Sequence, residues 1–202
     1  MGKKKPQPAA TPPANSVQPA SRAAWRAWLE ANHTQTEGVW VVTYKKAANK
    51  PRLTYDEMVE EALCFGWVDS KPGKLDDART MLYFAPRKPR SGWSKPNKER
   101  VARLIEAGLL APAGLAKIEA AQKDGSWSAL DAVEALEVPA DLATALAALP
   151  NATELFDAFP RSVKRGILEW IASAKKPETR TKRVEETATL AAENKRANQW
   201  RG

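Results

Sequence analysis

Residues 54–70 read Thr-Tyr-Asp-Glu-Met-Val-Glu-Glu-Ala-Leu-Cys-Phe-Gly-Trp-Val-Asp-Ser, and they join a helix directly to a strand. Thr54 and Glu57 have the spacing of a capping box, which starts a helix. Gly66 should end this helix, because glycine readily adopts the left-handed conformation found after a helix C-terminus. The aromatic and β-branched residues that follow, 67–70, favour a strand. One continuous segment therefore predicts a helix and a strand in the same core.

The flanking segments extend this pattern. Ser21 can cap a helix that runs to about His33, and residues 38–46 predict a strand. Residues 80–86 suggest another strand, which a type II turn at Pro72 and Gly73 would join to residues 67–70. Ser94 should cap a helix that ends at Gly108, and its expected inward residues are Val101, Leu104 and Ile105. The fold class is therefore α+β, a small antiparallel sheet packed with helices.

The rest of the chain predicts helices. Pro139, Pro160 and Pro177 each stand where a first helical turn would begin, and the last helix should bury Val184, Ala188 and Ala191. We expect four regions: a disordered tail rich in Lys, Pro and Ala at 1–20, an α+β domain at 21–110, a helical region packed on it at 111–174, and a basic helix at 175–202.

The net charge of +8 suggests at first a protein that binds polyanions. However, residues 1–24 and 175–202 each carry a surplus of +4, and residues 25–174 hold 20 basic and 20 acidic residues. The predicted globular region is therefore neutral. Its one strongly basic stretch, residues 79–103, has eight basic residues against the single acid Glu99.

The composition excludes several classes of site and segment. A single cysteine excludes an internal disulfide, and one Cys with one His cannot supply a zinc site; we expect no metal and no cofactor. No apolar run is long enough for a transmembrane helix, and the first 20 residues lack the apolar core of a secretion signal. We therefore expect no membrane insertion and a cytoplasmic location.

The best candidate site is the segment from Phe84 to Asn97. Its prolines stiffen a loop that should present cationic side chains just before the N-terminus of a helix, a suitable arrangement for phosphate or carboxylate. Trp93 could add a stacking face, or it could belong to the core. The candidate ligand-binding residues are Arg87, Lys88, Arg90, Ser91, Trp93, Ser94 and Asn97, with Trp67 and Asp69 as a wall.

The alternative reading is that Arg87 and Arg90 form structural ion pairs with Asp69, Asp76 or Asp77. Cys64 is better explained as a buried small apolar side chain than as a nucleophile, and His33 as a helix-capping residue. We therefore assign no catalytic role to Cys64 or His33.

Three segments carry a family resemblance. Residues 62–69, residues 84–97 and residues 174–183 resemble conserved blocks of the YdeI/OmpD-associated, or bacteriocin-protection, family. The resemblance implies a YjbR/CyaY-like α+β fold and a role in resistance to cationic peptides or bacteriocins. It brings no catalytic residues.

The resulting hypothesis is a non-enzymatic cytoplasmic protein of bacterial stress or antimicrobial resistance. It would bind an anionic group on a ligand or protein partner through residues 87–97. Two alternatives remain: a nucleic-acid-binding module that uses the same loop, the basic tails and an exposed tryptophan, and an enzyme for a small anionic substrate with Asp69 as acid or base beside Arg87.

Overall fold

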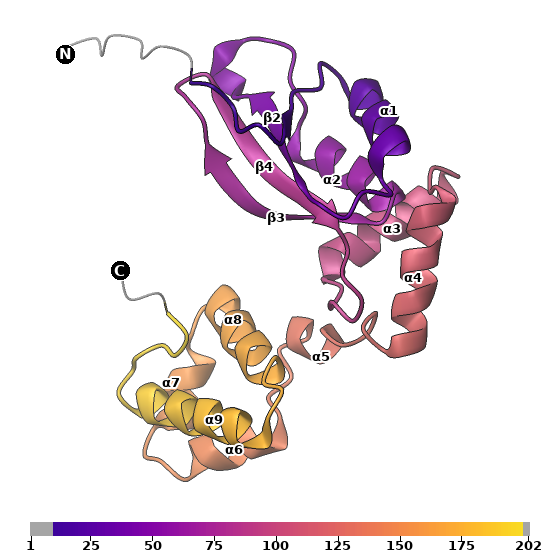
Figure 1. Ribbon diagram of the computed structural model, residues 1–202. Helices are drawn as coiled ribbons and strands as arrows, with labels where there is room; N and C mark the ends of the chain where they lie inside the picture. The colour runs from indigo at the N-terminus through magenta and orange to yellow at the C-terminus, as the bar shows by residue number, and fades with distance from the viewer. Residues whose placement is uncertain (1–9, 200–202) are drawn as a thin grey trace, which may run out of the picture. The chain divides into compact units, whose positions relative to one another are not determined.

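The chain divides into two compact units, residues 1–127 (unit 1) and 128–202 (unit 2), and the computed structural model describes residues 10–199 of it. Unit 1 contains β1 (Ser16–Val17), α1 (Arg22–Asn32), β2 (Val39–Tyr44), the 3-10 helix η1 (Lys46–Ala48), α2 (Tyr55–Cys64), β3 (Trp67–Lys74), β4 (Arg79–Pro86), α3 (Lys95–Glu106) and α4 (Pro112–Asp124). Unit 2 contains α5 (Asp131–Glu134), α6 (Ala140–Ala147), α7 (Ala152–Asp157), α8 (Arg161–Ala172) and α9 (Pro177–Ala192). The predicted α+β class, a sheet region followed by a helical region, is confirmed (Figure 1).

The sheet of unit 1 has the strand order β1-β2-β4-β3. β2, β4 and β3 pair antiparallel, as predicted, whereas the two-residue β1 pairs parallel to β2. β1 falls within the segment expected to be a tail, so residues 16–17 are ordered as a sheet edge. Residues 1–9 of that expected tail lie outside the described residues. Helices α1 and α2 lie on one face of the sheet (Figure 1).

The turn predicted at Pro72 and Gly73 is wrong. Both residues belong to β3, an edge strand, just after a register shift between Asp69 and Pro72, and edge strands and bulges are the places where a sheet tolerates proline. The chain reverses instead around Asp76, whose carboxylate accepts hydrogen bonds from the Ala78 and Arg79 amides. The side chain of Arg79 also binds this carboxylate, and its hydrogen bond is the main reason why the pKa of Asp76 is lowered.

The caps predicted for α1 and α2 are confirmed. The Ser21 hydroxyl accepts a hydrogen bond from the Ala24 amide, and Thr54 and Glu57 form both bonds of a capping box. Gly66 follows α2 with φ of +75°, the left-handed conformation that terminates the helix. At Ser94 the cap position is right, but its side chain makes no capping bond.

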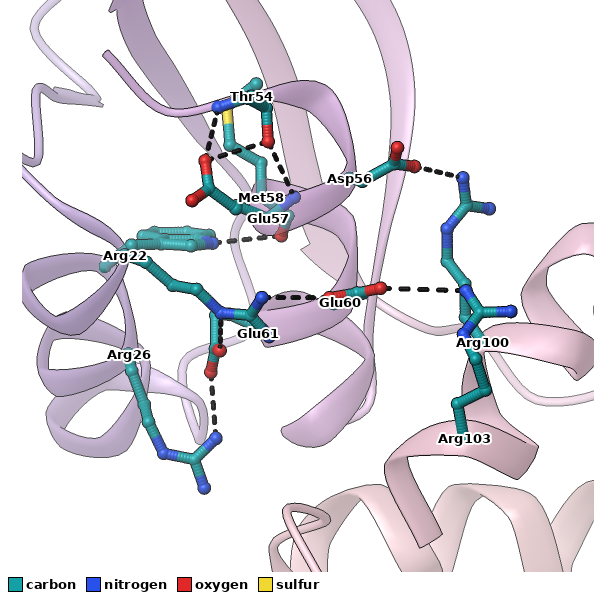
Figure 2. A network of polar contacts seen from close by, with 11 residues as sticks. Arg22, Arg26, Thr54, Asp56, Glu57, Met58, Glu60, Glu61, Arg100 and Arg103 are labelled. Atoms are coloured by element: carbon teal, nitrogen blue, oxygen red, sulfur yellow. Dashed lines mark hydrogen bonds and ion pairs between the residues drawn. The ribbon is translucent and has the colours of Figure 1, made fainter. Parts of the chain in front are cut away.

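α2 is held by ion pairs from the two helices beside it (Figure 2). Glu61, only 3% exposed, binds Arg22 and Arg26 of α1. Glu60 also pairs with Arg22 of α1, and two further pairs reach α3: Glu60 with Arg103, and Asp56 with Arg100. The buried charge of Glu61 is thus compensated by two cations, as burial of a charge requires.

α4 packs against the end of α2 at Gly114. A Cβ at this position would meet the carbonyl oxygen of Cys64 and would lie 2.9 Å from that of Leu63. The Ala111 amide, just before α4, donates to the Cys64 carbonyl over 3.0 Å. The two helix ends are therefore joined backbone to backbone.

Unit 2 has a core of its own, in which Leu142, Phe156 and Ile167 are fully or almost fully buried. Pro139 and Pro160 precede α6 and α8, and Pro177 is the first residue of α9. The predicted inner face of α9 (Val184, Ala188 and Ala191) is buried, which confirms that prediction.

In unit 1, by contrast, the prediction that Ile105 points inward is wrong, because this residue is 52% exposed. Within residues 10–199, no helix is long and apolar enough to cross a membrane.

The thiol of Cys64 should react only when unit 1 opens. Cys64 is fully buried, and burial raises its pKa, so the reactive thiolate is scarce as well as inaccessible. We expect a chromogenic disulfide reagent to modify the native protein at least about a hundredfold more slowly than the protein in denaturant. Equal rates would show that the thiol is accessible in the native state.

Candidate anion-binding site

The site is organised around Arg87, the first residue after β4. Its backbone amide donates to the Gly66 carbonyl over 2.9 Å, which ties it to the junction between α2 and β3. Its guanidinium stacks on the ring of Trp93 at 3.8 Å and donates to the carbonyls of Ser91 and Gly92. Trp93 is in turn fixed by its amide, which donates to Ser126, and by ring contact with Trp127 at 5.0 Å.

Arg87 is a buried cation without a buried anion. The residue is 5% exposed, its Nε has no hydrogen-bond partner, and no carboxylate in the described chain pairs with its guanidinium. Burial lowers the pKa of Arg87 to about 10, and the charge of Asp69 opposes this effect without direct contact. Glu61, the other buried charged side chain among the described residues, has its two arginines; Arg87 has no such partner.

A cavity of about 540 Å³ adjoins Arg87. Its walls come from the end of α1 and the residues after it (33–36), from the α2–β3 junction (65–67), from the end of β4 and the following loop (85–89), and from α4 (Ala113 and Lys117). The lining includes three cationic side chains, Arg87, Lys88 and Lys117, and no carboxylate. Side chains that could donate hydrogen bonds to an anion also line it, among them Thr34, Gln35 and Thr36.

The cationic residues expected at the site have different positions. Lys88 is exposed and lines the cavity, whereas Arg90 does not line it. Arg90 and Ser91 instead border a smaller cavity of about 70 Å³ between the loop and α4, which Arg87, Lys88 and Trp93 also line. Arg90 has φ of +59°, and its charge and amide help to lower the pKa of Asp124, after the larger effect of Ser126.

The remaining candidates are mainly structural. Trp93 is 1% exposed, so the stacking face suggested for a ligand is taken by Arg87 and Trp127. Ser94 occupies the cap position of α3, and Asn97 accepts a hydrogen bond from Arg100; neither lines the 540 Å³ cavity.

The two residues expected to form a wall are separated by the sheet geometry. Trp67 lines the cavity of Arg87, and its indole N–H donates to the His33 carbonyl over 3.0 Å. Asp69 does not line this cavity; its carboxylate accepts a hydrogen bond from the Tyr55 hydroxyl over 2.9 Å. Burial, followed by this bond, raises the pKa of Tyr55 to about 12.

Much of the charge in the basic stretch 79–103 is used within unit 1. Arg79 pairs with Asp76, Arg100 with Asp56 and Arg103 with Glu60. The ion pairs considered from the sequence, in which Arg87 and Arg90 would bind Asp69, Asp76 or Asp77, are not among them. Arg87 is the buried cation of this stretch, and it has no ion pair within the described chain.

Sequence reasoning missed Lys117 and the segment 33–36. Lys117 lies on α4, and its Cγ would be 2.6 Å from a Cβ on Gly66, so it crosses the point where α2 ends. No sequence spacing indicates a contact between positions about 50 residues apart. The only local signal was Gly66, whose missing side chain leaves room for the lysine. No group of three or more His, Cys, Asp or Glu side chains within residues 10–199 is arranged to hold a metal ion.

Comparison with protein families assigns both units. Residues 17–117 match the model of a domain of unknown function (DUF8412), and residues 135–194 match the model described as Bacteriocin-protection, YdeI or OmpD-Associated. Of the three segments that carry the resemblance, residues 174–183 lie within the second match and the other two within the first. No curated protein and no solved structure matches the chain. The chain therefore belongs to the DUF8412 family through its sheet unit and carries a YdeI/OmpD-associated, bacteriocin-protection domain in its helical unit.

Proposed function

We propose that this chain is a non-enzymatic cytoplasmic protein of stress or antimicrobial resistance that binds an anionic group on a ligand or partner through the cavity of Arg87. The observation that carries the proposal is the burial of Arg87 without a carboxylate partner, beside a cavity whose charged lining is entirely cationic. A buried charge is normally paired, and an anion in this cavity would supply the missing charge. The bacteriocin-protection match of unit 2 supports the cellular role.

The site differs from the exposed loop expected from sequence. Its binding groups are Arg87, Lys88 and Lys117, with Trp67 as a wall, while Arg90 lies outside. The nucleic-acid alternative included an exposed tryptophan, and Trp93, the tryptophan of this loop, is buried. The enzyme alternative needed Asp69 beside Arg87 in one cleft, and Asp69 is bound to Tyr55 instead.

Calorimetric titration of the full chain with inorganic phosphate and with acetate tests the proposal. We expect saturable binding of at least one anion, weakened about tenfold or more by Arg87→Met, because a charge-assisted hydrogen bond in a buried site contributes about 1.5–3 kcal/mol. Since Arg87 also supports the loop, Lys88→Ala combined with Lys117→Ala provides a second test at the rim. It should weaken binding severalfold while leaving the fold intact.

Arg90→Asn is the matched control. It removes a cation from the same loop outside the cavity, and asparagine tolerates the left-handed conformation at this position. Anion binding should survive this change. Absence of binding to the wild-type chain, or equal loss in Arg90→Asn and the rim variant, would refute the site.

A further inference from the structure

A second cavity, of about 370 Å³, lies at the other end of β4 from Arg87. It forms where the end of β2, the start of β4 and the first turns of α2 meet, and the loop 45–53 borders it. Its inner surface is apolar, from Leu53, Met58, Met81 and Leu82. Its volume is within the range of about 300–1,000 Å³ that is usual for small-molecule sites.

The charged side chains that line this cavity are all cationic. Lys45, Lys46 and Arg52 belong to its lining, and no carboxylate does. The Lys45 ammonium donates to the backbone carbonyl of Asp76 over 2.6 Å, and neither Lys46 nor Arg52 forms an ion pair in the described chain. Both Lys46 and Arg52 are exposed, so they can reorient toward a ligand at the mouth.

The nearest acids already have partners. Asp76 is held by Arg79, and Glu57 is engaged in the capping box of α2. Asp69 accepts the hydrogen bond of Tyr55, which itself lines the cavity. None of these carboxylates lines the cavity, although the pKa of Glu57 is lowered mainly by its bonds to Thr54 and further by the charge of Arg52.

We propose that this cavity binds a small amphipathic carboxylate, with its apolar body against Met58, Met81 and Leu82 and its carboxylate between Lys46 and Arg52. An apolar interior with cations only at the mouth selects a ligand that is hydrophobic at one end and anionic at the other. Burial of the body supplies most of the affinity, and the cations fix the direction of entry. This site does not depend on the cavity of Arg87.

Calorimetric titration of the full chain with naphthoate and with naphthalenemethanol tests the site, because the two probes share a body and differ in charge. We expect naphthoate to bind and the alcohol to bind about tenfold more weakly or not at all, as expected for charge-assisted contacts. Lys46→Ala combined with Arg52→Ala should reduce naphthoate affinity to that of the alcohol. Because both side chains are exposed, this variant should keep the fold.

The Lys88→Ala, Lys117→Ala variant serves as the control, since it removes the same number of cations from the other cavity. It should leave naphthoate binding unchanged, just as the Lys46, Arg52 variant should leave phosphate or acetate binding unchanged. The proposal is overturned if naphthoate does not bind, if the alcohol binds equally well, or if both double variants lose the same affinity.

Discussion

Gly114→Ala should destabilise unit 1 by about 3 kcal/mol, the upper end of the usual cost of overpacking a core. The added methyl group would meet the carbonyl of Cys64 and lie close to that of Leu63, and both are backbone atoms that no rotamer change can move. α4 must therefore shift away from α2, which weakens the bond from the Ala111 amide to Cys64. Chemical denaturation followed by tryptophan fluorescence measures the loss.

Gly166→Ala is the matched control for this change. Gly166 lies inside α8, and a Cβ there would meet nothing within 4 Å. Removing a helical glycine should then stabilise unit 2 by about 0.5–1 kcal/mol, an effect to be followed by far-ultraviolet circular dichroism. If Gly114→Ala were also stabilising, the close packing of α4 on α2 would be wrong.

Thr43→Val should cost about 2–4 kcal/mol although it preserves shape and suits a strand. The Thr43 hydroxyl donates to the carbonyl of Leu53 and accepts from its amide, at 3.1 and 3.0 Å, and all of these groups are buried. Valine would leave both backbone groups of Leu53 without a partner, and each buried unsatisfied group costs about 1–3 kcal/mol. Equilibrium denaturation in urea gives the difference.

Thr80 is the natural control because it pairs with Thr43 on the neighbouring strand. Its hydroxyl makes one bond, to the Gly73 carbonyl, and the residue is only half-buried, so water can replace the bond. We expect Thr80→Val to cost less than about 1 kcal/mol. Similar losses of stability at both positions would mean that the cost comes from replacing threonine by valine in a strand, and not from the lost hydrogen bonds to Leu53.

The local features of the fold could be predicted because short-range chemistry determines them. Ser21, Thr54 with Glu57, and Gly66 each act within four residues of their own position, and all three behave as expected. The turn at Pro72 failed because the same dipeptide also suits a bulged strand. The pairing of β3 with β4 decides between the two, and this pairing is a property of the whole sheet.

The candidate site shows the same limit. The sequence indicated Arg87 and Lys88 because basic residues are concentrated around a stiff loop. It could not show that Trp93 turns inward and stacks on Arg87, because an aromatic residue just before a helix can be either buried in the core or exposed to solvent. Nor could it place Lys117, which reaches the site only through the packing of α4 on α2.

The division into two units has a practical consequence for spectroscopy. Six of the eight tryptophans belong to unit 1: Trp25, Trp28, Trp40, Trp67, Trp93 and Trp127. In the described part of unit 2 the indole emission comes from Trp170. Intrinsic fluorescence is therefore a reporter of the sheet unit, and unfolding confined to unit 2 would leave most of the emission unchanged while helical ellipticity falls.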